Sequence, residues 1–220
     1  MLGTADMMQS LHWSILDDER LAVLPLLKES TKGGFYLAGG TGLALMLGHR
    51  DSVDFDFFLT GDFDSTALTQ YLESLFSGHT LSITQQDTNT VSCLIDETIQ
   101  LSFLGYRYPL VRPLIESAFF PIASIEDIGC MKLSAITSRS VEKDYIDLYF
   151  ILKHVSLTDL LALSAEKHPT LDTGLILKSL VYFDDVQREP ILFKEGHHAT
   201  FEEVKEFLRA EVSAYFDSLK

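Results

Sequence analysis

Residues 39–58 of this chain read GGTGLALMLGHRDSVDFDFF. A glycine pair opens an apolar run, and two aspartates, Asp54 and Asp56, then stand one residue apart among phenylalanines. An unpaired charge buried in an apolar environment costs on the order of several kcal/mol. We therefore expect these carboxylates to face something that offsets their charge.

The alternation within SVDFDFFL predicts which side chains share a face. In an extended strand, Asp54 and Asp56 project together, while Val53, Phe55 and Phe57 project from the opposite face. Two carboxylates on one face of a strand suit a hard cation such as Mg²⁺, or Mn²⁺, which takes oxygen ligands and often bridges to phosphates. The pair is the candidate metal site.

The turn before the apolar run is a candidate phosphate site. Gly39 and Gly40 expose backbone N–H groups where a strand turns into a helix, and the Thr41 hydroxyl adds a donor. A glycine pair alone is usually only a turn, and a lone Asp-x-Asp is common on exposed strands. In this order, however, they outline a phosphoryl-transfer centre.

These residues resemble a known superfamily. Gly40-Thr41, twelve residues and then Asp54-Phe55-Asp56 is similar to the Gly-Ser/Thr and Asp-x-Asp signature of nucleotidyltransferases of the DNA polymerase beta-like kind. The resemblance implies a metal-dependent transfer of a nucleoside monophosphate (NMP) from a nucleoside triphosphate (NTP) to a hydroxyl group. In this comparison the glycine turn holds the triphosphate and the aspartates bind metal.

The longer stretch resembles the AbiEii/AbiGii-type toxins of bacterial abortive-infection and toxin–antitoxin systems. His49, Arg50 and Ser52 match that branch, as do Lys132 and the later KDYIDLYFIL with Arg139 before it, so the match spans roughly residues 34–153. The resemblance implies an RNA acceptor such as tRNA, or a protein acceptor, and a cognate antitoxin. It adds Arg50 and Ser52 to the nucleotide-binding residues.

The helical part of the chain carries further candidates. The resemblance implies that Lys132 contacts nucleotide phosphates and that Asp147 orients it or approaches the acceptor. Asp144 and Asp147 are three residues apart and share a helix face. A structural cluster of ion pairs that fixes the helical part to the sheet is the alternative for Arg139 and Asp144. For His49 and Arg50 the alternative is capping of the preceding helix.

One position departs from the superfamily pattern. A third acidic residue is expected on a nearby strand, and the best match in TIQLSFLGY is Ser102, a poor base near neutral pH. Asp147 or Asp96 could substitute, a one-metal mechanism could operate, or the chain could be slow or inactive. The second hypothesis is therefore a catalytically impaired nucleotide-binding or regulatory module of the same fold.

The fold class predicted is α+β: a nucleotidyltransferase-like mixed sheet flanked by helices, followed by a C-terminal helical domain. Turn and cap residues divide the chain into elements. In the first half we expect helices at 7–30 (interrupted near Pro25), 41–47 and 65–76 (capped by Asp64 or Ser65). The expected strands are at 33–40, 52–59, 81–87, 90–96 and 98–106. In the second half we expect helices at 124–138 (capping box of Ser124 and Asp127), from Ser140 to 154, and at 157–166, 173–183 and 200–217. The three-proline segment 106–121 predicts domains at 1–122 and 123–220.

Composition limits the function further. A net charge of −15 argues against broad, non-specific nucleic-acid binding. No run has transmembrane length, and the first residues lack a signal-peptide pattern, so no membrane partner is expected. Cys93 and Cys130 are expected as free, buried thiols of a cytoplasmic protein.

Overall fold

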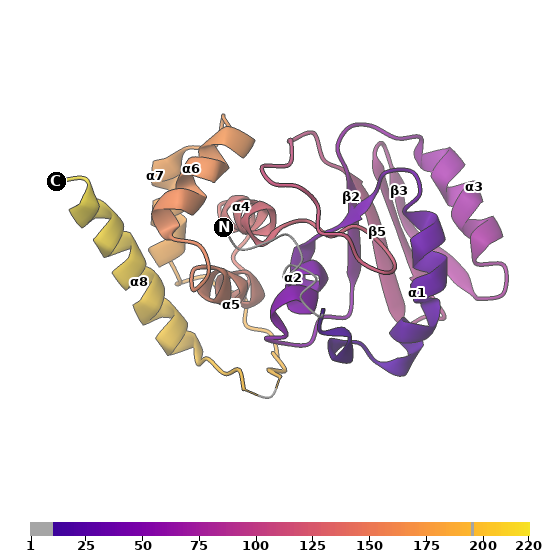
Figure 1. The fold of residues 1–220 in the computed structure, drawn as a ribbon, viewed down its shortest axis with the longest axis horizontal. Coiled ribbons are helices and arrows are strands. Elements are labelled where there is room, and N and C mark those ends of the chain that lie inside the picture. The colour runs from indigo at the N-terminus through magenta and orange to yellow at the C-terminus, as the bar shows by residue number, and fades with distance from the viewer. Residues whose placement is uncertain (1–10, 195) are drawn as a thin grey trace.

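A five-stranded mixed sheet forms one half of the molecule in a computed structural model that describes residues 11–194 and 196–220 (Figure 1). The strand order is β1-β2-β5-β4-β3. The strands are β1 (Tyr36–Leu37), β2 (Phe55–Leu59), β3 (Leu81–Asp87), β4 (Thr90–Ile95) and β5 (Ile99–Gly105). The pair β2 and β5 is parallel, and every other neighbouring pair is antiparallel. The predicted α+β class with a mixed sheet is confirmed.

The strands β3, β4 and β5 form the predicted antiparallel meander. Its turns contain residues with positive φ, namely Asn89 at 57°, Asp96 at 49° and Glu97 at 64°. Asn and Asp tolerate this left-handed conformation better than most residues because their short polar side chains bond locally. The meander places the middle of β5 directly beside β2.

Three helices accompany the sheet: α1 (Asp18–Ser30), α2 (Gly39–Leu47) and α3 (Ser65–Leu75), preceded by a 3₁₀ turn at Trp13–Ile15. The predicted interruption at Pro25 is wrong, because α1 continues through it. Pro25 is exposed, so water can satisfy the carbonyl group that loses its helical hydrogen bond. Asp64 caps α3 as expected, by accepting from the backbone N–H groups of Thr66 and Ala67. The predicted helical residues 7–10 lie outside the described residues.

Five helices form the other half: α4 (Ile125–Ala135), α5 (Glu142–Ile151), α6 (Leu157–Lys167), α7 (Thr173–Val181) and α8 (Phe201–Ser218). Ser124 caps α4, but Asp127 does not complete a capping box, because its carboxylate accepts from Lys167 and from loop N–H groups instead. The predicted start of α5 at Ser140 is one residue early, since Val141 is the N-cap.

A single hydrophobic core crosses both halves. Helix α2 packs against α4 so closely that a Cβ on Gly42 would lie 3.3 Å from Ile128 Cδ1. The chain at the proposed domain boundary is itself bonded to the sheet, with Ala123 donating to the Leu37 carbonyl at 2.8 Å. The division at residue 122 therefore stays a prediction. Both cysteines are buried and free, as expected.

One further sequence expectation concerns membrane spans. Within residues 11–194 and 196–220, no helix combines the length and apolarity that crossing a bilayer requires. Trp13 packs edge-on against Phe119 and Phe120, with ring centroids 5.3 and 6.1 Å away. These aromatic contacts attach the three-proline segment to the start of the described chain.

Candidate active site

The beginning of α2 requires glycine at two consecutive positions. Gly39 has a φ of 64°, and a Cβ there would lie 2.8 Å from Asp56 Oδ2. A Cβ on Gly40 would lie 2.6 Å from Nη2 of Arg50. Among the described residues no side chain caps this helix end, so its first N–H groups are open to a ligand or solvent. The glycines let the helix start come close to a carboxylate and a guanidinium group.

The predicted alternation along β2 is confirmed within the strand. Phe55 and Phe57 are fully buried on one face, and Asp56, on the other, is half-buried. The strand begins at Phe55 rather than at Ser52, so Asp54 precedes it and is exposed. Val53 lies outside the strand as well, which explains why it is 45% exposed instead of buried.

Asp56 is a carboxylate without adequate counter-charge from the protein. Burial, followed by repulsion from Asp54, raises the pKa of Asp56 above its ordinary value, although Lys132 and Arg139 act in the opposite direction. A divalent cation between the two carboxylates would remove this repulsion, so the donor set fits a hard cation that completes its shell with substrate oxygens or water. Within the described parts of the chain no cluster of three or more potential metal ligands occurs.

Ser102 lies on β5, at the position where the resemblance to the superfamily implied a third acidic residue. It is the direct partner of Asp56 in the parallel register between β2 and β5, and it is buried. Its hydroxyl group lowers the pKa of Asp56, against the effect of burial. Asp96 is elsewhere: it occupies the exposed β4–β5 turn, where it bonds His79 and the Thr80 N–H. It therefore does not line this site.

The Thr41 side chain points into the protein. It is buried, donates to the Asp54 carbonyl group, and lies 2.9 Å from the Ser52 hydroxyl. These contacts fix the loop that carries Asp54 against the start of α2. Ser52 itself lines the cavity described below, whereas the predicted phosphate contact of the Thr41 hydroxyl would need this arrangement to change.

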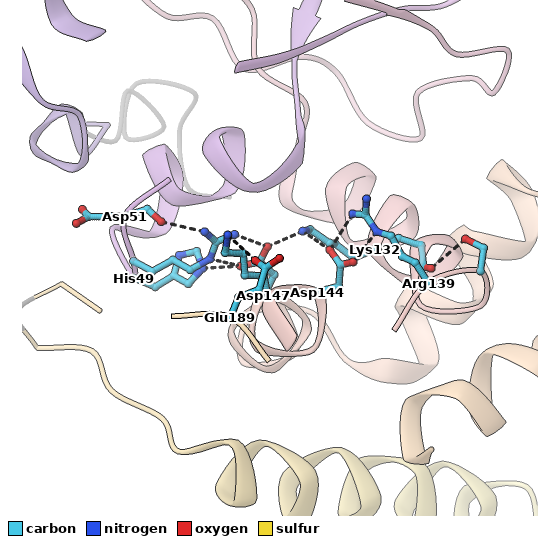
Figure 2. Close-up of polar contacts among 11 residues, drawn as sticks. His49, Asp51, Lys132, Arg139, Asp144, Asp147 and Glu189 are labelled. Atoms are coloured by element: carbon cyan, nitrogen blue, oxygen red, sulfur yellow. Dashed lines mark hydrogen bonds and ion pairs between the residues drawn. The ribbon is translucent and has the colours of Figure 1, made fainter. Parts of the chain in front are cut away.

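Asp147 is the centre of a buried polar network on α5 (Figure 2). Its carboxylate accepts hydrogen bonds from Arg50 Nε and Nη2, both at 2.8 Å, and from His49 Nε2 at 2.9 Å, and it forms an ion pair with Lys132 Nζ at 2.6 Å. Burial alone would raise its pKa, but Arg50, Lys132 and the hydrogen bonds hold the pKa of Asp147 well below its usual range. Asp147 is therefore ionised, and it is too low in pKa to act as a base near neutral pH.

Lys132 connects this network to a second carboxylate. Its ammonium group lies 2.7 Å from Asp144 Oδ1, and Arg139 donates to the same carboxylate at 2.9 and 3.2 Å (Figure 2). Burial lowers the pKa of Lys132, but the two aspartates reverse this effect and keep it charged. Two aspartates thus face three cationic side chains, Arg50, Lys132 and Arg139, all of which line the cavity.

His49 is neutral in this network. Burial lowers the pKa of His49 and outweighs the hydrogen bond to Asp147. Its Nε2–H then donates to Asp147, and Nδ1 has no partner among the described residues. The sequence suggested helix capping as the alternative role of His49 and Arg50. It could not reveal their bonds to Asp147, because 98 and 97 residues separate the partners.

The site opens into a cavity of about 470 Å³ between the two halves. This volume is within the range of small-molecule sites, roughly 300–1,000 Å³. The candidate residues that line it are Gly40, Arg50, Ser52, Asp54, Asp56, Lys132, Arg139 and Asp144. The carboxylates, one glycine of the turn and the cationic network therefore share one space.

One wall of the cavity was missed at the sequence level. Residues 187–194, here called the strap, run between the start of α5 and the loop after α2, and Glu189, Pro190, Ile191 and Leu192 line the cavity. The strap has no helical or alternating periodicity that could have predicted its place. Its charged side chains form ion pairs with α5 and with the loop after α2, for example Lys194 with Asp51 at 2.5 Å.

Known proteins are similar to this chain in sequence and in fold. The sequence pattern of the family described as "Nucleotidyl transferase AbiEii toxin, Type IV TA system" matches residues 25–218. A protein of Aquifex aeolicus (strain VF5) is 38% identical over 190 residues, which cover 84% of this chain and 89% of the relative.

Two solved structures are similar at lower identity. MenT4, a nucleotidyltransferase toxin from Mycobacterium tuberculosis H37Rv, superposes with a TM-score of 0.58 at 17% identity, over 88% of this chain and 82% of that chain. A protein of H. pylori assigned as a nucleotidyltransferase gives 0.55 at 19% identity, over 96% and 99%. These likenesses agree on the fold, and the family match covers most of the sequence. The chain belongs to the AbiEii nucleotidyltransferase toxin family.

Proposed function

We propose that this protein transfers an NMP from an NTP to a hydroxyl group on an RNA, such as tRNA, or on a protein, and that it acts in the cytoplasm as the toxin of a toxin–antitoxin pair. The observation that carries the proposal is the shared cavity. Asp54 and Asp56, which suit a metal ion, face the same space as Lys132 and Arg139, which suit a polyphosphate.

The reaction is a displacement at the α-phosphorus of the NTP. The acceptor oxygen forms a bond to that phosphorus, the bond to the β-phosphate bridging oxygen breaks, and pyrophosphate leaves with the electron pair while the hydroxyl proton passes to solvent or a base. Mg²⁺ or Mn²⁺, held by Asp54 and Asp56, would supply charge neutralisation on the transferred phosphate.

The protein's own groups would position the reactants. The N–H groups at the start of α2, with Gly39 and Gly40, offer donors for the triphosphate. Lys132 is held by a hydrogen bond to Asp144 and an ion pair with Asp147, and it lines the cavity, where its ammonium group would bind a phosphate oxygen. Arg50 is held by Asp147 in the same way, and Ser52 adds a hydroxyl. Asp147 supports transfer by orienting these cations.

The experiment is an incubation of the protein with each labelled NTP, Mg²⁺ or Mn²⁺, and total tRNA or a cell lysate. Transfer of label to an acceptor at a rate that Asp56→Asn strongly reduces supports the proposal. Asp96→Asn is the matched control, because it removes an equivalent carboxylate from the distant β4–β5 turn. If no NTP labels any acceptor with either metal, the proposed transfer is rejected.

A second candidate function is a nucleotide-binding or regulatory module with impaired turnover. Ser102 favours it, because a hydroxyl group stands beside Asp56 where a third carboxylate would bind metal or activate the acceptor. This candidate predicts that NTP with Mg²⁺ raises the thermal unfolding midpoint without any transfer. An antitoxin partner would be common to both functions.

A further inference from the structure

The cavity has two walls of different chemistry. Its apolar members are Val53, Val141, Pro190, Ile191 and Leu192. Three of these are consecutive in the strap, and Val141 is bridged to the strap through Gln187. The charged members come mainly from the loop after α2, from β2 and the residue just before it, from α4 and the loop after it, and from the first turn of α5, and the strap itself contributes Glu189. The apolar surface is therefore concentrated on the wall that the strap forms.

The strap is held in place at both ends. Gln187 exchanges backbone hydrogen bonds with the start of α5, donating to Ser140 at 2.8 Å and accepting from Glu142 at 3.0 Å. At the other end, Leu192 accepts from the Asp51 N–H at 2.9 Å. These bonds fix the wall beside the cavity, and Ile191 and Phe193 also pack against the core, whereas Pro190 and Leu192 are exposed.

Two of the apolar residues that line the cavity are exposed. Leu192 is 67% exposed and Val53 is 45% exposed, and both line the cavity mouth. Single exposed apolar residues are ordinary on a surface. Here, however, an exposed apolar wall faces a wall that carries two unneutralised carboxylates and a cationic network.

An NTP has the same division, with a polyanion at one end and an apolar, planar base at the other. We propose that the strap residues Pro190, Ile191 and Leu192 form the nucleobase subsite and pack against one face of the base. This inference rests on the proposed function, because it requires the triphosphate to bind at the charged wall. Apolar side chains stack on any base, since every base has a planar face.

The subsite has a defined energetic consequence. Aliphatic contact with the base contributes to NTP affinity and does not differ between ground state and transition state, so its loss raises KM and leaves kcat unchanged. An inorganic triphosphate, which has no base, does not use the subsite. A strap residue that contacts the base therefore affects the binding of NTP but not of inorganic triphosphate, whereas a residue with a general structural role affects both.

The test compares two leucines of nearly equal exposure. Leu192→Ser removes the subsite contact, and Leu219→Ser, at a position that is 65% exposed just after α8, is the matched control. Binding of Mg-NTP and of Mg-tripolyphosphate is measured by calorimetry for both variants, with Leu192→Met as a conservative rescue. We expect Leu192→Ser to weaken NTP binding about tenfold, with tripolyphosphate binding unchanged, and both Leu219→Ser and Leu192→Met to behave like the wild type.

Two results overturn the subsite. The first is that Leu192→Ser loses affinity for NTP and for tripolyphosphate equally. The second is that Leu192→Ser keeps its NTP affinity but has a raised KM for the acceptor, which would assign this wall to acceptor binding. Because binding is measured without turnover, a protein that binds NTP through this wall but transfers nothing would refute the proposed reaction and support the subsite.

Discussion

Two groups of aspartates lie beside the same cavity and have opposite electrostatics. Asp147 is fully buried, yet three side chains of the protein bind its carboxylate, and its pKa is held well below the usual range. Asp56 is only half-buried, but burial and the adjacent Asp54 raise its pKa. The more deeply buried carboxylate is thus the better compensated one.

This difference separates a structural role from a ligand-binding role. The carboxylate of Asp147 is compensated without a ligand, and its network links α5, α4 and the loop after α2. The pair Asp54 and Asp56 is incomplete, because no cationic side chain forms an ion pair with either carboxylate among the described residues. A group that the protein leaves uncompensated is a candidate for an external counter-charge.

The largest effect on stability is expected from Asp147→Ala. Removing the carboxylate leaves Lys132 and Arg50 charged in a buried site, so the free energy of unfolding should fall by about 3–5 kcal/mol. Urea denaturation followed by circular dichroism measures this loss. The control is Asp217→Ala, which breaks an exposed pair with Lys220 and should change stability by less than about 1 kcal/mol. If the free energy of unfolding fell equally in Asp147→Ala and Asp217→Ala, the buried network would contribute no more to stability than an exposed ion pair.

Asp56→Asn should give the opposite pattern. The transfer rate should fall roughly 10²- to 10³-fold, the loss typical of removing one electrostatic group from a preorganised site. The free energy of unfolding should stay the same or rise, because the variant removes a carboxylate whose charge is unfavourable in the folded protein. Rate and stability are measured on the same preparation. A large loss of stability would show that Asp56 is structural.

Ser102→Asp would make the incomplete site more complete. An acid at this register position would stand beside Asp56 as a third carboxylate. We expect the variant to be less stable without metal, to gain more stability from Mg²⁺ than the wild type does, and to transfer NMP about tenfold faster if a general base is what the site lacks. Thermal unfolding with and without Mg²⁺ measures the first two effects. An unchanged response to Mg²⁺ would place the metal elsewhere.

The smallest effect is expected from mild acid. The pKa of His49 lies below 6.5 in the folded protein, so below pH 6.5 the unfolded chain binds a proton that the folded chain does not, and stability falls as the pH falls. Asp147, whose ordinary pKa is 3.8, adds a second loss at still lower pH. Urea unfolding across this range should show both phases, and His49→Gln should reduce only the first, to which His168 also contributes because burial lowers its pKa to about 4. A wild-type stability that rises on acidification through 6.5 would contradict this.

Much of the fold could be predicted because its signals are local. The meander, the helices after residue 123 and the cap at Asp64 follow from alternation, helical periodicity and turn residues within short windows. The errors were local as well. Pro25 lies on an exposed face, where water tolerates the missing hydrogen bond, and β2 starts only where pairing with β5 begins, at Phe55.

The sequence by itself determined the parts whose geometry depends on near neighbours: glycines at a strand-to-helix turn, and two aspartates on alternate residues at the start of a strand, one just before it and one within it. Only the tertiary structure decided which carboxylates are compensated, since Asp147 meets His49 and Arg50 across nearly a hundred residues. It also decided the parallel register that sets Ser102 beside Asp56, and the path of the strap. Long-range contacts of this kind depend on how the whole core packs, and no short window of sequence contains that information.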